Sequence, residues 1–145
     1  MSDTDAFTDQ QIIALTAYGE ARGLGSDGMQ ATINTIQNRV YSGIRWWGTG
    51  FREVCLKPWQ YSCWNATDPN RPKLFQVTED DPQYTIALQL AADGLSGQLD
   101  DLTNQADSYY DDRMPSMPLW ADGLTPTFIL KTQKYFKTVE WLTNA

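Results

Sequence analysis

The stretch Thr8–Gly25, TDQQIIALTAYGEARGLG, decides the fold because it carries a helix whose two ends are both marked. Thr8 and Gln11 have the T-x-x-Q spacing of a capping box, in which each residue bonds to the other's backbone N–H. We expect the helix to run to about Ala21 and to stop at the glycines that follow, beginning with Gly23. The sequence therefore predicts a chain that begins on a well-defined helix.

Glu20 is the residue of this helix that points to chemistry. It follows Ile13 and Ala17 by seven and three residues, which places it on their inward face. It also lies in the last turn, where the helix dipole disfavours a negative charge, and partial burial disfavours that charge further. Both effects favour the protonated carboxyl that a general acid needs. Position alone leaves open the alternative that Glu20 turns outward and is merely solvated.

Two further helices are expected in the first two thirds of the chain. The second has an apolar stripe in steps of four, three and four residues: Met29, Ile33, Ile36 and Val40. Ser26 or Asp27 is expected to cap it, and Gly43 to end it. The third helix is expected to start at Pro82, with Asp81 as its cap.

The remainder is expected to be irregular, with short strands near the end. Prolines break up the segment Lys57–Glu79, which indicates irregular structure or short strands. In the last third we expect short extended segments at Tyr109–Tyr110, Phe128–Leu130 and Tyr135–Val139. A chain of 145 residues suits one domain with one core, and no repeat or linker divides residues 1–145. The expected fold class is α+β, mostly helical with a short β region.

Composition excludes several classes of function. Acidic residues outnumber basic ones by 18 to 11, whereas nucleic acids and anionic membranes attract clustered Lys and Arg. The chain has no histidine, which excludes a Ser-His-Asp triad, a Cys-His peptidase and a His-ligated zinc site. We expect no metal, cofactor or nucleic-acid partner. The polar start Met1–Asp5 does not resemble a signal peptide, and no apolar run is long enough to cross a membrane.

The middle of the chain carries two cysteines around a polar and aromatic segment. Cys55 and Cys63 are spaced so that a disulfide between them would close a small loop, and the alternative is two buried free thiols. The segment Lys57–Trp64, KPWQYSCW, mixes amides, hydroxyls and indoles. This mixture is typical of sugar sites, which need hydrogen bonds for hydroxyls and apolar faces for rings. An ordinary core strand with buried Tyr and Trp is the alternative.

Several motifs, in matching order, resemble the cell-wall hydrolase family typified by the spore cortex-lytic enzyme SleB. Residues 17–23, AYGEARG, are similar to the family's Y-x-E-A-R-G stretch, and residues 37–40, QNRV, to the Asn-Arg-Val that ends its second helix. Residues 57–62, KPWQYS, resemble its Q-P-x-x-F-S element, while 107–110, DSYY, and 134–136, KYF, resemble its tyrosine-rich strand and final hairpin. The resemblance covers roughly residues 10–139. The family's final histidine is missing here.

The resemblance implies a lysozyme-like fold related to lytic transglycosylases, and cleavage of the bond between N-acetylmuramic acid and N-acetylglucosamine in peptidoglycan. It gives Glu20 the role of catalytic acid. It also implies a sugar groove, for which the candidate lining residues are Gln60, Ser62, Trp64, Tyr109 and Tyr110.

The absence of a signal peptide gives the resemblance a biological setting. The chain looks like a monomeric phage endolysin, made in the host cytoplasm and released by a holin to the peptidoglycan of the periplasm. The oxidising periplasm would favour a bridge between Cys55 and Cys63.

Two alternatives stay open at this point. A two-carboxylate muramidase would pair Glu20 with Asp107, Asp111 or Asp112. A non-catalytic virion or wall-binding protein would keep the fold and the groove without activity. Because only Glu20 lies in a recognisable catalytic motif, a lytic transglycosylase that produces 1,6-anhydromuramoyl ends is the expected enzyme.

Overall fold

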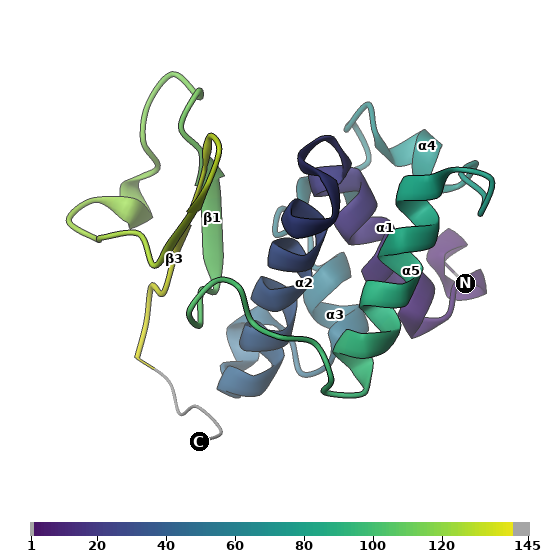
Figure 1. The fold of residues 1–145 in the computed structure, drawn as a ribbon, viewed down its shortest axis with the longest axis horizontal. Coiled ribbons are helices and arrows are strands. Elements are labelled where there is room, and N and C mark those ends of the chain that lie inside the picture. The colour runs from purple at the N-terminus through teal and green to yellow at the C-terminus, as the bar shows by residue number, and fades with distance from the viewer. Residues whose placement is uncertain (1, 141–145) are drawn as a thin grey trace.

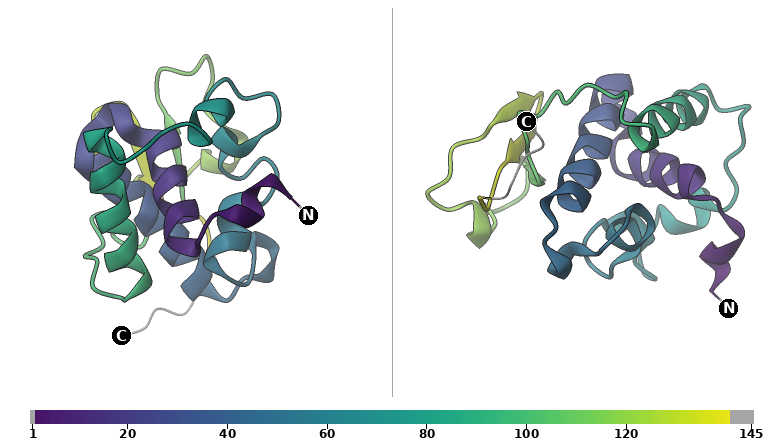
Figure 2. Two further views of the ribbon diagram at one scale, coloured as in Figure 1. Left: turned by 90° about the vertical axis from the view of Figure 1, so that its right-hand side faces the viewer. Right: turned by 90° about the horizontal axis from the view of Figure 1, so that it is seen from below.

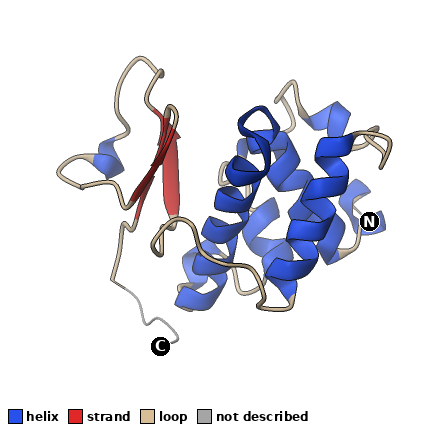
Figure 3. Cartoon of the chain, in the orientation of Figure 1, coloured by secondary structure: helices blue, strands red, loops and turns tan. Residues whose placement is uncertain are grey.

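The computed structural model describes residues 2–140, which form a group of helices with a small sheet beside it (Figure 1, Figure 3). The long helices are α1 (Asp9–Ala21), α2 (Gly25–Ser42) and α5 (Pro82–Leu95), and the short ones are α3 (Phe51–Leu56) and α4 (Arg71–Leu74). The strands β1 (Ser108–Asp111), β2 (Phe128–Leu130) and β3 (Gln133–Phe136) form an antiparallel sheet in the order β1-β3-β2. Five 3₁₀ helices complete the described elements: η1 (Asp3–Ala6), η2 (Arg22–Leu24), η3 (Arg45–Trp47), η4 (Ser62–Trp64) and η5 (Leu119–Ala121). The α+β class with a short β region is confirmed.

Helix α1 is the centre of the core. Its predicted capping box is present: the Gln11 N–H donates to Thr8 Oγ1 at 3.1 Å, and the Thr8 N–H donates to Gln11 Oε1 at 2.8 Å. Every residue from Ile12 to Gly19 is buried, because α2 and α5 pack on one part of its circumference and α3, α4 and η4 on the rest. A helix buried all round is typical of a domain core.

The other helix boundaries are partly as predicted. Gly43 ends α2 with a left-handed φ of 72°, and Asp81 caps α5 by accepting from the Gln83 N–H at 2.9 Å. The predicted cap of α2 at Ser26 or Asp27 is wrong. Because η2 leads directly into α2, both residues already lie in the first helical turn, and no side chain caps it.

The segment from Lys57 to Glu79 forms η4 and α4 with turns between them, and no strand, so that part of the prediction is corrected. Prolines do not exclude a helical turn when they fall at its start, as Pro72 does in α4. Helix α3 was not predicted either, because its six residues are too few to show a helical period. In the last expected strand, β3 begins at Gln133 and ends at Phe136, not at Val139.

A stripe of amide side chains on α2 attaches the segment that leads to the sheet. Gln30, Asn34 and Asn38 follow one another at intervals of four and therefore share one face of the helix. Gln30 and Asn34 donate to the Asp100 carbonyl at 2.9 and 3.0 Å, and Asn38 donates to the Ala106 carbonyl at 2.8 Å. Arg39, the residue after Asn38, adds a further bond by donating to the Asp107 carbonyl at 2.6 Å. These bonds hold residues 100–107 along α2, and β1 starts from their end (Figure 1).

Gly19 allows α1 and η4 to approach each other very closely. A Cβ at Gly19 would lie 2.8 Å from Cys63 Cβ and 2.9 Å from Cys63 Sγ, well inside contact distance. Glycine in a helix interior costs about 0.5–1 kcal/mol relative to alanine. The close approach has a use at the next residue, since it brings the Cys63 backbone N–H to 3.0 Å from Glu20 Oε2.

Gly19→Ala is expected to destabilise the fold by about 1–3 kcal/mol, because the new methyl overpacks the contact with Cys63. Gly23→Ala is the matched control, since no heavy atom lies within 4 Å of a Cβ there and its effect should stay within about 0.5 kcal/mol. Urea unfolding of both variants measures the difference. In a double-mutant cycle, Cys63→Gly should relieve the penalty and Cys63→Ala should not, because alanine keeps the clashing Cβ. Equal stability of Gly19→Ala and wild type would contradict the close approach.

Candidate active site

A cavity of about 750 Å³ lies where the helices face the sheet, and Glu20 is on its wall. Figure 2 shows the sheet standing beside α2, at the far side from α5. The helical side contributes Glu20, Arg39, Trp46, Trp47 and residues 57–62, while the sheet side contributes residues of β1 and of the segment that follows it. The residues that line the cavity include Glu20, Arg39, Trp46, Trp47, Lys57, Trp59, Gln60, Tyr61, Ser62, Ser108, Tyr109, Tyr110 and Trp120.

Three donors from two parts of the molecule converge on the Glu20 carboxyl group. The Tyr109 hydroxyl donates to Oε1 at 2.7 Å. The Cys63 backbone N–H and the Ser62 hydroxyl donate to Oε2 at 3.0 and 3.3 Å. Glu20 is half-buried at the last turn of α1, so its carboxyl is both fixed in orientation and open to the cavity. A positioned carboxyl of this kind can donate a proton to a bound molecule and take one back.

Tyr109 is held as a neutral donor for Glu20. Its ring packs against Tyr61 and Tyr135, with centroids 6.5 and 5.5 Å away. Burial, and secondly the charge on Glu20, raise the pKa of the Tyr109 hydroxyl well above its ordinary value. The hydroxyl therefore stays protonated and donates a hydrogen bond to the Glu20 carboxyl group. Since Tyr109 belongs to β1, the sheet supplies one of the three bonds that hold Glu20.

Arg39 places a positive charge in the same cavity. Its guanidinium lies over the rings of Trp47 and Tyr61, at 5.0 and 5.4 Å from their centroids, and donates to the Asp107 carbonyl and the Ser108 hydroxyl. In the described part of the chain it forms no ion pair with a carboxylate. Arg39 therefore both attaches the segment that leads into β1 and lines the cavity wall.

Four of the five expected groove residues line this cavity. Ser62 and Tyr109 contact Glu20 directly, and Tyr110 stacks on Phe136 with ring centroids 5.6 Å apart. Gln60 lines the cavity, but its amide nitrogen is used internally: it donates to the Trp47 and Val54 carbonyls at 2.9 and 2.8 Å. Gln60 therefore also fixes the cavity wall to α3.

Trp64 does not line the cavity and is corrected to a core residue. Its indole is buried, and its Nε1–H donates to Thr16 Oγ1 at 2.8 Å inside the helical core. Ser62 and Trp64 lie in the 3₁₀ helix η4, whose three residues per turn direct these two side chains to different sides. The sequence motif around Trp64 does not indicate whether its indole faces a sugar groove or the core.

None of the three aspartates considered as a partner for Glu20 lines the cavity. Asp107 is completely buried, and its carboxylate accepts from Thr138 and Ser108. Asp111 forms an ion pair with Arg113, which lowers the pKa of the Asp111 carboxyl to about 2. Asp112 is exposed outside the cavity. Among the residues from 2 to 140, Glu20 is the only acidic residue of the cavity wall.

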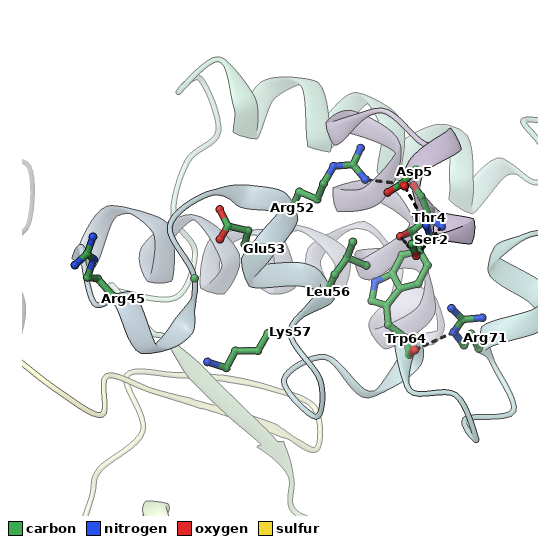
Figure 4. Close-up of a pocket in the computed structure, with 11 residues that line it drawn as sticks. Ser2, Thr4, Asp5, Arg45, Arg52, Glu53, Leu56, Lys57, Trp64 and Arg71 are labelled. Atoms are coloured by element: carbon green, nitrogen blue, oxygen red, sulfur yellow. Dashed lines mark hydrogen bonds between the residues drawn. The ribbon is translucent and has the colours of Figure 1, made fainter.

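A second groove, of about 610 Å³, lies between α3 and the N-terminal residues (Figure 4). Two of its three arginines, Arg52 and Arg71, are engaged in structural bonds. Arg52 donates to the Thr4 carbonyl at 3.2 Å, and Arg71 donates to the Trp64 carbonyl and forms an ion pair with Asp3. The groove is therefore the place where the N-terminal segment is attached to the helices.

Sequence reasoning did not single out Trp46, Lys57 or Trp59 as groove residues, although Lys57 and Trp59 lie in the segment Lys57–Trp64 that it proposed as a sugar site. Trp46 lies in the short helix η3, and Lys57 and Trp59 lie in the turn after α3, where no periodic pattern indicates which way a side chain points. The available signal was the density of tryptophan around lysine in residues 46–59. For the described residues, no group of three or more His, Cys, Asp or Glu side chains gathers as metal ligands do. No helix within residues 2–140 has the length and apolar character needed to cross a membrane.

The chain belongs to the Cell Wall Hydrolase family, whose model matches residues 23–136. Membership of this family makes it a peptidoglycan-degrading protein. The matched range begins after Glu20, so the assignment of Glu20 depends on the geometry above and on the similarity of the surrounding motif.

Two solved structures share the fold. The catalytic domain of the Bacillus cereus SleB protein is 21% identical with a TM-score of 0.68, over 89% of this chain and 89% of that one. The catalytic domain of the germination-specific lytic transglycosylase SleB from Bacillus anthracis is 20% identical with a TM-score of 0.64, over 92% and 98%. The expected lysozyme-like fold is thereby confirmed. No curated protein matches the chain significantly.

Cys55 and Cys63 are two buried free thiols in this structure, which is the second of the two alternatives considered. Burial raises the pKa of the Cys55 thiol to about 12. Burial, and then the neighbouring charge of Glu20, also raise the pKa of the Cys63 thiol. Since the thiolate is the reactive form, both groups are protected in the folded protein.

The native protein is therefore expected to leave Ellman's reagent almost unreacted at pH 8. Burial raises the pKa of both thiols well above the ordinary value, so neither forms the reactive thiolate at this pH. After denaturation in urea, two thiols per chain should react. The experiment uses unreduced protein purified from an oxidising compartment. Fewer than two thiols after denaturation would show that the bridge forms there, and rapid reaction of the native protein would contradict the burial.

Proposed function

We propose that this protein is a lytic transglycosylase that cleaves the β-1,4 bond between N-acetylmuramic acid and N-acetylglucosamine, with Glu20 as its single acid and base. The observation that carries the proposal is that Glu20 is the only acidic residue on the wall of its cavity, among the residues described. Three fixed donors orient its carboxyl group. The lytic transglycosylase named among the structural matches supports the same reaction.

A single carboxyl group is sufficient for this reaction. Protonated Glu20 gives its proton to the glycosidic oxygen, the bond from that oxygen to the muramoyl C1 breaks, and the leaving sugar departs with a 4-hydroxyl. The Glu20 carboxylate then removes the proton of the muramoyl 6-hydroxyl, whose oxygen bonds to C1 and closes a 1,6-anhydro ring. Glu20 ends protonated, as it began, and no water is consumed. Because the attacking hydroxyl belongs to the same sugar, its effective concentration replaces that of a positioned water.

The hydrolytic alternative requires a second carboxylate. In retaining glycosidases the two carboxyl groups lie about 5 Å apart, and in inverting ones roughly 6.5–9.5 Å apart. Asp107 is enclosed by its own hydrogen bonds, and Asp111 is paired with Arg113. Neither contributes to the cavity wall, which favours the single-acid reaction.

The biological setting is a further part of the proposal. We propose that the protein acts as a monomeric phage endolysin, made in the host cytoplasm and released by a holin to the peptidoglycan. The support is the sequence resemblance together with the family assignment. Expression in a Gram-negative host should cause lysis only when a membrane pore is co-expressed, and lysis without a pore would contradict the holin requirement.

Glu20→Gln is expected to lower the rate of peptidoglycan solubilisation by about 100- to 10,000-fold, because the amide keeps the shape but cannot donate the proton. The matched controls are Asp111→Asn and Asp112→Asn, which should retain activity because both residues lie outside the cavity. Turbidity loss of purified sacculi measures the rates, and mass spectrometry reads the products of the wild type. We expect muropeptides that are one water lighter and resist borohydride reduction. Reducible muramic acid ends, or loss of activity in an aspartate variant, would instead support the muramidase.

A further inference from the structure

Two tryptophans are displayed to solvent at the Glu20 cavity. The side chains of Trp46 and Trp59 are 72% and 81% exposed, whereas Trp47 and Trp64 are only 8% exposed. Trp46 and Trp59 both belong to the cavity wall. Exposing an indole forgoes the stabilisation that its burial would give, so two such residues beside one cavity indicate a surface that a ligand covers.

Trp59 is fixed in its exposed position by an unusual backbone. Its φ is 69°, in the left-handed region that a bulky residue rarely adopts. The Trp59 N–H donates to Asn65 Oδ1 at 3.1 Å, which holds this conformation from the far side of the turn. Strained backbone of this kind is concentrated at binding sites. The exposed position of the Trp59 indole is therefore fixed by the backbone of the turn.

Lys57 places an ammonium group against Trp46, on the wall of the same cavity. Its Nζ lies 3.9 Å from the centroid of the Trp46 ring and donates to the Trp46 carbonyl. In Figure 4 the Lys57 side chain extends away from the arginines that attach the N-terminal segment. An ammonium group has three donor hydrogens, and no carboxylate of the described residues lies within ion-pair distance of this one. In a chain of net charge −7, the cavity wall nevertheless carries two cations, Lys57 and Arg39, against one acid.

We infer that Trp46, Lys57 and Trp59 form a subsite for the muramoyl unit of the strand, recognised as a sugar ring that bears a carboxylate. The inference rests on the proposed function. The apolar faces of the two indoles are suited to the faces of sugar rings, and the Lys57 ammonium is suited to the anionic group. The carboxylate has two sources with the same chemistry: the lactyl group of a bare strand, or the stem peptide of a substituted one. Lys57 is then the residue that distinguishes peptidoglycan from a neutral N-acetylglucosamine polymer.

The test measures binding by calorimetry in the Glu20→Gln background, where cleavage does not interfere. The probes are chitotetraose, an alternating N-acetylglucosamine–N-acetylmuramic acid tetrasaccharide with free lactyl groups, and the same tetrasaccharide with stem peptides. We expect at least one anionic probe to bind about tenfold more tightly than chitotetraose, a gap that narrows at high salt. Lys57→Met should abolish the gap, and Lys57→Arg should keep it. Lys73→Met, which removes a lysine outside the cavity, is the matched control.

Each outcome decides something. Loss of the gap with Lys57→Met alone supports the subsite, and the probe that loses affinity identifies the lactyl group or the stem peptide as its ligand. Trp59→Ala should weaken all three probes by a similar factor. If the three probes bind equally and Lys57→Met changes nothing, the inference is wrong while the proposed function stands. If no probe binds, the inference is wrong, and the proposed function is decided separately by the products released from purified sacculi. Thermal melting of each variant separates misfolding from loss of binding. The salt dependence of probe affinity in the folded Glu20→Gln protein is a second measurement that needs no further substitution.

Discussion

The hydrogen bonds between the amide stripe of α2 and the backbone of residues 100–107 are the constraint on which the site depends. The sheet itself is small, and buried apolar contact with the helices is limited to a few side chains around Ala31 and Tyr135. Polar bonds therefore set its position. Asn34 is completely buried, so leaving its amide unpaired would carry the full cost of desolvation. With this segment fixed, β1 runs along the cavity, and Tyr109 reaches Glu20 across 89 residues of sequence.

Glu20 is consequently held from both sides of the cavity by donors of different kinds. The helical side offers a backbone N–H, available only because Gly19 has no side chain at its contact with Cys63. The sheet side offers the Tyr109 phenol, whose pKa is raised further above its ordinary value by burial. A carboxyl group fixed in this way loses little freedom when a ligand binds, which is what pre-organised proton transfer requires.

The sequence was informative where a local rule determines structure and uninformative where the outcome depends on distant contacts. The Thr8 capping box and the Gly43 termination follow from residues within one turn, and both are present. The place of Trp64 depends on how η4 turns above Thr16, 48 residues earlier in the chain. The cavity position of Lys57 likewise depends on a contact with Trp46, which no periodicity indicates. Glu20 could be singled out as a candidate because a helix position and a family motif coincide on it, and it lies on the cavity wall.

The amide stripe has a consequence for how this architecture tolerates change. Gln30, Asn34 and Asn38 bind carbonyl groups, which every residue type supplies, and one backbone N–H, which only proline lacks; Asn38 also donates to the Asp101 carboxylate. Substitutions along that segment can therefore accumulate without loosening the attachment, provided the three amides and Asp101 persist. An anchor made mainly of main-chain bonds lets most side chains of residues 100–107 change while the sheet keeps its distance from Glu20.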